Sequence, residues 1–231
     1  MVDTEEIFKG RYRFRKKKER HATFIQTRLR MRDYTKIGIL GKGHNITYLY
    51  KSNTEKDRQY AVRENVVRSD SEFVKICLTI KSLDSLYMNK HPNILDYEGY
   101  AVDDNVVSDS RLQKFKIIYI ITEAGKMSMN DLILQRQKEE EYLTFKSASI
   151  IMAGLFSGLA ELHYKDITHC DIKPSNIIIT HDGTYKLGDL GEVKNIIHRA
   201  ALQHTLTTSL DYAAPEIIEM FNLTNHLSSN F

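Results

Sequence analysis

The sequence predicts an α+β fold, with most strands in the first half of the folded chain and most helices in the second. Between residues 34 and 122, runs of β-branched and aromatic residues are separated by turn residues. Between residues 129 and 163, apolar residues instead recur at helical spacing. The 231 residues, 42% of them hydrophobic and only 3 of them proline, are enough for a folded core in one large or two small domains.

The first predicted strands flank a glycine-containing turn. Residues 37–40 lead into Gly41-Lys42-Gly43, and the β-prone run 46–50 follows. Backbone N–H groups in such a turn can meet phosphate oxygens, because no side chain stands in the way. Three further strands are predicted, over residues 60–63, 94–102 and 116–122, with a polar surface loop over 103–111.

Three helices are predicted from capping signals and apolar spacing. Ser69 and Glu72 have the spacing of a capping box, and apolar residues then recur at helical period at Ile76, Ile80, Leu83 and Leu86. A second helix begins near Met129 and leads into a charged linker, residues 135–141. The third spans residues 147–163, and its apolar face is expected to comprise Ile150, Ile151, Leu155, Leu159 and Leu162.

The stretch from His169 to Gly191 carries the densest set of chemically capable side chains. Two short strand-like runs, 177–179 and 185–187, flank Asp182-Gly183 and predict a tight hairpin. Closing the hairpin brings its two polar ends together, with Asp171, Lys173 and Asn176 before it and Asp189 after it. Carboxylate and amide oxygens suit Mg²⁺, and a further carboxylate can orient or deprotonate a hydroxyl. The alternative is a solvated polar loop beside a surface hairpin, which explains neither the register nor the spacing.

This stretch resembles the catalytic core of the eukaryotic protein kinases, of the serine/threonine type. His169-Cys170-Asp171 with Lys173 and Asn176 is similar to H-R-D-x-K-x-x-N, and Asp189-Leu190-Gly191 is similar to D-F-G. Ala214-Pro215-Glu216 resembles the A-P-E that closes the activation segment. The resemblance implies a bilobal kinase-like fold: a β-rich N-lobe with one helix over residues 34–123, and a mostly helical C-lobe over 124–231 that lacks the helices following A-P-E.

The resemblance also implies an activity, transfer of the γ-phosphoryl group of Mg²⁺-ATP to a serine or threonine of a protein substrate. Asp171 would accept or orient the substrate hydroxyl, Lys173 would meet the transferred phosphate, and Asn176 and Asp189 would hold Mg²⁺. The residues that it implies for nucleotide binding are Leu40, Gly41, Gly43, Ala61, Arg63, Thr122, Glu123, Ala124 and Ile178.

Four positions in the predicted N-lobe depart from the family pattern. Ile46 stands at the third glycine of the glycine-rich loop, and either Tyr48 or Leu49 takes the place of the valine above the adenine. Arg63 replaces the phosphate-anchoring lysine, and Ser82 falls where the family has a helix glutamate. Arginine and lysine are not interchangeable at a tight phosphate site. The alternative to an active kinase is therefore a pseudokinase that binds nucleotide or serves as a scaffold.

The segment from residue 192 to 213 resembles an activation segment and contains Thr205 and Thr208. Family members regulated there usually carry an arginine before the catalytic aspartate, where this chain has Cys170. A phosphate in the segment would lack this partner, so we expect weak switching by phosphorylation.

Charge is unevenly distributed, although the net charge is only +3. Residues 1–38 hold 12 Lys and Arg against 5 Asp and Glu, a net +7, which leaves −4 for the rest. Residues 1–33 are expected to be an extension whose basic run, 11–20, is either a solvated arm or a patch for nucleic acid or an anionic surface. No membrane span and no secretory signal are predicted. With two cysteines expected to be packing residues, this favours a cytoplasmic or nuclear protein.

Overall fold

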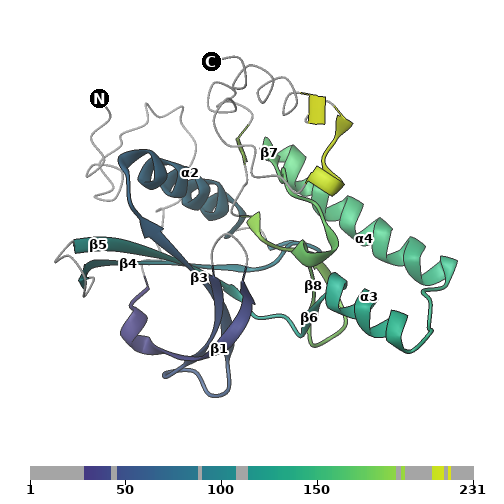
Figure 1. Ribbon diagram of the computed structural model, residues 1–231, viewed down its shortest axis with the longest axis horizontal. Helices are drawn as coiled ribbons and strands as arrows, with labels where there is room; N and C mark the ends of the chain where they lie inside the picture. Colours follow the sequence, from purple (N-terminus) through teal and green to yellow (C-terminus); the bar gives the residue numbers. More distant parts are fainter. Residues whose placement is uncertain are drawn as a thin grey trace, which may run out of the picture. The chain divides into compact units, whose positions relative to one another are not determined.

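The computed structural model describes residues 29–42, 46–87, 90–107, 114–190, 194–195, 210–215 and 218–219. The chain divides into two compact units, Met1–Asp84 with Tyr97–Glu123 and Ser85–Asp96 with Ala124–Phe231. The first unit ends at Glu123, and residues 85–96 belong to the second unit, while the lobe boundary itself stays a prediction. Figure 1 shows the large sheet with helix α2 in the first unit and helices α3 and α4 in the second.

A five-stranded antiparallel sheet with the order β1-β2-β3-β5-β4 forms the first unit. Its strands are β1 (Tyr34–Lys42), β2 (Ile46–Ser52), β3 (Gln59–Val67), β4 (Tyr97–Val107) and β5 (Lys114–Glu123). The predicted β-rich first half is thus confirmed. The strand predicted over 94–102 begins only at Tyr97 and continues to Val107, so part of the expected polar loop is strand.

The two faces of β3 carry different residues, because side chains alternate along a strand. Tyr60 and Val62 are buried in a cluster whose other buried members are Tyr50, Ala101 and Ile121. Leu29 and Met31 pack against this cluster, and the Leu29 N–H donates to the carbonyl of Tyr100 at 2.8 Å. Packing therefore begins a few residues before Tyr34, while the boundary of the domain at that residue stays a prediction.

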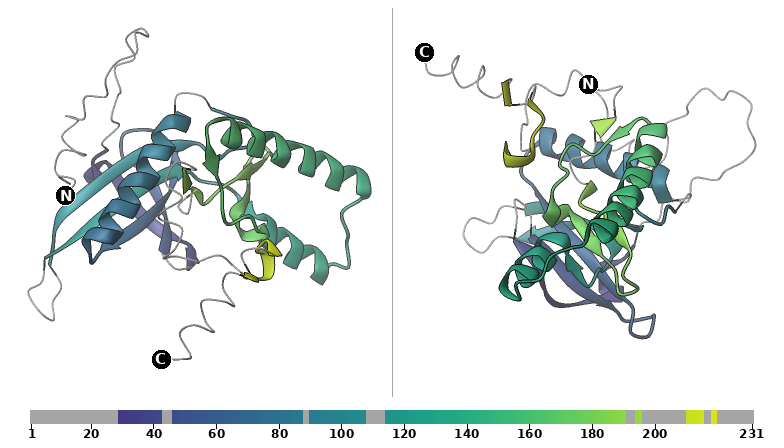
Figure 2. Two further views of the ribbon diagram at one scale, coloured as in Figure 1. Left: turned by 90° about the horizontal axis from the view of Figure 1, so that it is seen from above. Right: turned by 90° about the vertical axis from the view of Figure 1, so that its right-hand side faces the viewer.

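Helix α2 (Asp70–Tyr87) begins where the capping pattern predicts. The Ser69 hydroxyl accepts from the Glu72 N–H at 3.2 Å, while the Glu72 carboxylate accepts from the N–H of Arg68, one residue earlier than in an ideal capping box. In the first unit, Phe73, Cys77, Ile80 and Leu83 of α2 are buried. Ile76, which the sequence placed in the apolar pattern, is only half-buried. The Lys116 ammonium of β5 lies 4.7 Å from the Phe73 ring centre, which places α2 on one face of the sheet (Figures 1 and 2).

The second unit contains helices α3 (Met129–Lys138) and α4 (Phe145–Tyr164) and a small sheet of order β6-β8-β9. Its strands are β6 (Met127–Ser128), β8 (Ile177–Ile179) and β9 (Tyr185–Leu187), and a second pair joins β7 (Ile167–Thr168) to β10 (Lys194–Asn195). Three 3₁₀ turns complete the described elements: η1 (Met31–Asp33), η2 (Pro174–Asn176) and η5 (Leu210–Tyr212). A capping box between Ser128 and Asp131 opens α3, which extends four residues into the expected linker.

The buried face of α4 differs from the predicted one. Ile151, Leu155, Gly158 and Leu162 are buried, whereas Ile150 is 64% exposed. At 3.6 residues per turn, Ile150 lies about 110° around the helix from the centre of that buried face. The chain therefore turns Ile150 outward, and its assignment to the core face was wrong.

Helix α4 is 20 residues long and is, by length and composition, apolar enough to cross a membrane. Such helices also occur in protein cores, and the buried side of α4 packs inside the second unit. A Cβ on Gly158 would lie 2.8 Å from the Asn93 carbonyl oxygen and 3.2 Å from Leu187, so the helix approaches these residues as a core helix does.

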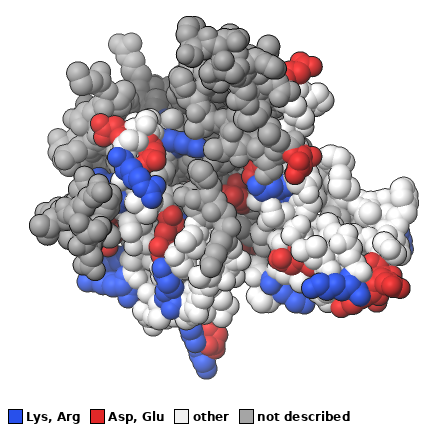
Figure 3. Space-filling model, in the orientation of Figure 1, with Lys and Arg blue, Asp and Glu red and all other residues white. Residues whose placement is uncertain are grey.

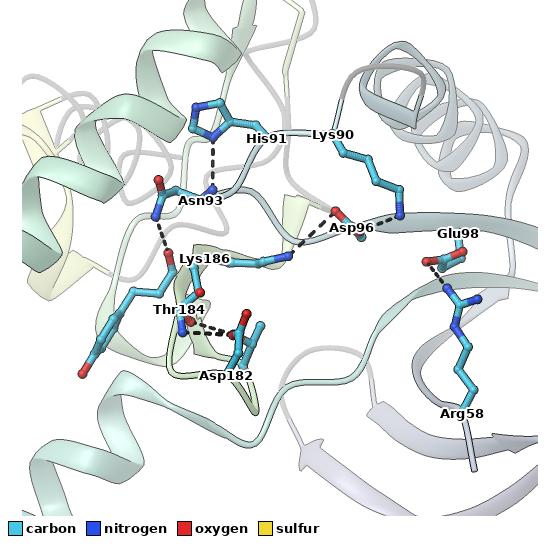
Figure 4. A network of polar contacts seen from close by, with 11 residues as sticks. Arg58, Lys90, His91, Asn93, Asp96, Glu98, Asp182, Thr184 and Lys186 are labelled. Carbon is cyan, nitrogen blue, oxygen red and sulfur yellow. Dashed lines mark hydrogen bonds and ion pairs between the residues drawn. The ribbon is translucent and has the colours of Figure 1, made fainter. Parts of the chain in front are cut away.

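Residues 90–96 are attached to the β8–β9 hairpin of the second unit (Figure 4). The Leu95 N–H donates to the Leu187 carbonyl at 2.9 Å, and the Leu187 N–H donates to the Asn93 carbonyl at 2.8 Å. The Asn93 amide donates to the Tyr185 carbonyl at 2.9 Å, and the Asp96 carboxylate lies 3.9 Å from the Lys186 ammonium. These bonds extend the edge of β9, which explains why this segment does not begin β4.

Candidate active site

The loop before β8 brings three of the predicted catalytic side chains into contact. Asp171 and Asn176 are 7% and 6% exposed. The Asn176 amide nitrogen donates to the Asp171 carboxylate at 2.8 Å and to its carbonyl at 2.7 Å. The Lys173 ammonium lies 2.7 Å from the same carboxylate. The loop thus holds a buried carboxylate between an amide and a cation, at the spacing that the sequence predicted.

His169 connects this loop to the end of the hairpin. It is 1% exposed, its Nε2 lies 2.9 Å from the Gly188 carbonyl oxygen, and its Nδ1 lies 3.3 Å from the Asp171 nitrogen. These partners require Nε2 to donate and Nδ1 to accept. Burial lowers the pKa of His169, against the opposing effects of the Gly188 bond, Asp189 and Asp171. The ring is therefore neutral and structural, as expected for a hydrogen-bonded core residue.

The hairpin returns the chain to this loop. Strands β8 and β9 pair in register, Ile177 with Leu187 and Ile179 with Tyr185, and Gly183 makes the turn with a φ of +84°. Just after β9, the Gly188 N–H donates to the Asn176 carbonyl at 2.8 Å. Asp189 is the next residue along the chain, and its carboxylate is exposed. The predicted hairpin is confirmed, and it brings Asp189 next to a residue that is bonded to Asn176.

Two non-glycine residues at this place adopt left-handed backbone conformations. Cys170, just before Asp171, has a φ of 66°, and Asp189 has a φ of 47°. Such conformations cost free energy for residues with a Cβ and persist where the surroundings impose them. Here the hydrogen bond between the His169 ring and the Gly188 carbonyl holds the two segments together. The surroundings therefore impose the unusual backbone conformations of Cys170 and Asp189.

The donor set fits a magnesium ion that also binds phosphate. The Asn176 amide nitrogen faces Asp171, so its oxygen is the atom left to face a cation, and Asp189 supplies an exposed carboxylate. Mg²⁺ prefers oxygen ligands and commonly takes one or two protein ligands together with water and phosphate oxygens. Within the described residues, no three His, Cys, Asp or Glu side chains form a cage that would hold a metal without such help.

The first unit carries most of the residues predicted to bind nucleotide. Ala61 of β3 is the cross-strand partner of Thr122 of β5, whose hydroxyl lies 3.4 Å from the Ala61 carbonyl. Glu123 pairs with Tyr60 at the end of the same strand. Arg63 lies on the same face of β3 as Ala61, and its Nε donates to the Asn65 side chain at 3.3 Å.

The glycine-containing turn is described only in part. Leu40 and Gly41 lie on β1 beside an irregularity in the pairing with β2, and Gly43 lies outside the described residues. The register of β2 and β3 decides between two alternatives: Leu49 lies opposite Ala61 and therefore on its face, whereas Tyr48 packs with the cluster on the other face. The register thus favours Leu49 over Tyr48 for the place of the family's valine.

Ala124 and Ile178 belong to the second unit. After Ala124 the chain runs against β8, where the Lys126 N–H donates to the Ile179 carbonyl at 2.7 Å. A Cβ on Gly125 would lie only 2.0 Å from Cγ2 of Ile178, so glycine is required for this approach. The structure thus places Gly125, which follows the predicted nucleotide-binding residue Ala124, directly beside Ile178.

Two further polar residues were not identified from the sequence. Asn65 is buried in the middle of β3, and Asn93 bonds to the hairpin of the second unit. A polar amide inside a β-prone run was an available signal for Asn65. Nothing local could have identified the partner of Asn93, because Tyr185 lies 92 residues further along the chain.

Comparison with known proteins identifies the family. A family model described as the protein kinase domain matches residues 34–229. The chain belongs to the protein kinase domain family.

Its curated relatives include serine/threonine kinases of much greater length. A Candida albicans protein named "Serine/threonine-protein kinase STE7 homolog" is 26% identical over 201 residues, which are 86% of this chain and 32% of that protein. The Caenorhabditis elegans "Mitogen-activated protein kinase kinase kinase nsy-1" is 30% identical over 186 residues, 78% of this chain and 11% of that protein. The chain thus spans a third or less of the length of these relatives.

Proposed function

We propose that this chain transfers the γ-phosphoryl group of Mg²⁺-ATP to a serine or threonine hydroxyl of a protein substrate. The observation that supports the proposal most directly is the buried contact among Asp171, Lys173 and Asn176, with Gly188 bonded to Asn176. Phosphoryl transfer depends on positioning and charge stabilisation, which such a cluster supplies.

Each residue has one role in this proposal. The Asp171 carboxylate, oriented by the Asn176 amide, accepts or orients the proton of the substrate hydroxyl. The Lys173 ammonium stabilises charge on the phosphoryl group as it moves. Asn176 and Asp189 hold Mg²⁺, which when bound neutralises negative charge on the phosphate oxygens.

Transfer of radiolabelled phosphate from Mg²⁺-ATP to a mixed protein substrate tests this proposal. Asp171→Asn keeps the size of the side chain but removes the base, and we expect it to lower the rate by at least about 100-fold. Ser175→Ala, an exposed position in the same loop, is the matched control and should retain the wild-type rate. Equal transfer by wild type and Asp171→Asn would contradict the proposal.

The second candidate function is nucleotide binding or scaffolding without catalysis. Arg63 and Ser82 favour it, since they replace both members of the family's lysine–glutamate pair. Ser82 is buried, and its hydroxyl donates to the Leu78 carbonyl within α2. This function predicts that Mg²⁺-ATP raises the melting temperature while no transfer occurs and while Asp171→Asn changes nothing.

A cytoplasmic or nuclear location and a polyanion-binding role for residues 11–20 remain part of the proposal. That run lies outside the described residues. On the described surface drawn in Figure 3, Lys and Arg lie among Asp and Glu. The net positive charge of residues 1–38 therefore supports the basic run as the site for an anionic partner. Salt-dependent binding of the full chain to heparin, lost when Lys16, Lys17 and Lys18 become Ser, would test it.

A further inference from the structure

Asn65 is a buried amide in the interior of a β-strand, where apolar residues are usual. It is 3% exposed, and its cross-strand partner on β5 is Ile118. Because side chains alternate along β3, it lies on the same face as Arg63, two residues earlier. A buried polar side chain at such a position must find hydrogen-bond partners.

The partners of Asn65 determine how its amide is oriented. Its nitrogen donates to the carbonyl of Ile118 at 3.0 Å and to the carbonyl of Arg63 at 3.2 Å. Its oxygen accepts from Nε of Arg63 at 3.3 Å. The reversed amide would turn its N–H groups toward the guanidinium donor and its oxygen toward two carbonyl oxygens. The strand therefore presents a fixed acceptor to Arg63.

This contact differs in kind from an ion pair. An amide is neutral, so it holds the guanidinium without cancelling its charge, and it engages Nε rather than the two terminal nitrogens. The helix position where the family has a carboxylate carries the uncharged Ser82, which bonds within α2.

We propose that Asn65 is a positioning residue that holds the Arg63 guanidinium in place to bind the phosphates of a nucleotide. The inference rests on the proposed nucleotide binding by Arg63. Asn65 thus replaces, from the same strand, the support that other kinases obtain from a helix. Arginine rather than lysine is suited to this arrangement, because only the guanidinium has an Nε–H part-way along the side chain.

Calorimetric titration of the full chain with Mg²⁺-ATP and with adenosine tests the role of Asn65. Adenosine lacks phosphate and therefore does not report on Arg63. We expect Asn65→Leu to weaken Mg²⁺-ATP binding about tenfold and to leave adenosine binding unchanged. In an Arg63→Met background the same substitution should have no further effect on ATP. Asn65→Thr, which suits a strand, should give a similar selective loss and serves if the leucine variant does not fold.

Ser52→Ala is the matched control. Ser52 is a buried polar residue at the end of β2, where its hydroxyl accepts from two backbone N–H groups, whereas Arg63 pairs with Thr47 near the start of that strand. Ser52→Ala should lower the melting temperature, but it should not weaken the binding of Mg²⁺-ATP more than that of adenosine.

Four results would overturn the inference. Equal losses for ATP and adenosine would show a merely structural role for Asn65. A loss that persists in the Arg63→Met background would show that Asn65 does not act through Arg63. If Arg63→Met weakens ATP binding but neither Asn65 variant does, the inference fails and the proposed function stands. A wild-type chain with no affinity for Mg²⁺-ATP would overturn both.

Discussion

For single residues, burial shifts the pKa of several side chains in this protein. His169 is neutral because its ring is enclosed between the loop and the hairpin. Burial also raises the pKa of the Cys77 thiol to about 11, so this cysteine stays protonated and acts as a packing residue, as predicted. Asp84 lies on α2 and is the last residue of that helix in the first unit. Burial raises the pKa of its carboxyl group to about 6 and outweighs the hydrogen bond with Tyr97, which lowers it.

We predict that Asp84 makes stability depend on pH. The carboxyl group ionises near pH 4 when unfolded and near pH 6 when folded, so the folded state binds the proton more tightly. Its contribution to stability is therefore greatest below pH 4, falls between pH 4 and 6, and is constant above. Asp84→Asn should raise the free energy of unfolding by on the order of 2 kcal/mol at pH 7.5, and by less at pH 4.

Urea unfolding of both proteins at pH 4, 5, 6 and 7.5 measures this difference. Comparing the two curves cancels the titration of all other groups. A stability difference that is the same at every pH would show that Asp84 is not the titrating group.

Among the elements, the β8–β9 hairpin is the one that organises the site. Its strands are only three residues each, and its stability comes from bonds at both edges. The segment 93–95 bonds to β9, and residues 126–128 bond to β8. An isolated hairpin is only marginally stable in water. The bonds to neighbouring segments at both edges, rather than the turn alone, therefore stabilise this hairpin.

We predict that Gly125 cannot be replaced by alanine without loss of stability. The added Cβ would lie 2.0 Å from Cγ2 of Ile178, so β8 or the chain before α3 must move. Overpacking of this kind costs about 1–3 kcal/mol, measured by urea unfolding. Gly41→Ala is the matched control, because its Cβ would meet nothing within 4 Å.

A second substitution checks the cause. Ile178→Ala removes the clashing methyl group, so Gly125→Ala should cost less in that background than in the wild type. Equal costs in the two backgrounds would show that the Ile178 contact is not responsible.

Over the whole molecule, the residues that the sequence predicts for nucleotide binding and for catalysis divide between the two compact units. The sheet of the first unit presents Ala61, Arg63 and Thr122, and the loop and hairpin of the second present Asp171 and Asn176. Family members regulated through the activation segment usually carry an arginine before the catalytic aspartate, and in this chain Cys170 stands at that position. Its sulfur lies 3.6 Å from the Thr168 carbonyl, and it carries no guanidinium.

We predict that aspartate at Thr205 or Thr208 changes the phosphate-transfer rate less than about twofold. Both residues lie outside the described part of the chain. The physical reason is the missing arginine, since an anion there lacks that charge-assisted partner. Cys170→Arg supplies the partner, and in that background the aspartate variants should raise the rate. A several-fold change in the wild-type background would contradict the prediction.

The sequence by itself determined the family, the α+β class, the hairpin and the order of polar residues around it. These features depend on local spacing: a turn at Gly183, alternation in short strands, and a capping signal before α2. Tertiary structure alone decided that residues 90–96 join the second unit, that Ile150 faces outward, that Leu49 rather than Tyr48 shares a face with Ala61, and that Asn65 holds Arg63. Each of these depends on strand register, helix rotation or contacts between distant residues, which hydrophobic spacing in one segment does not specify.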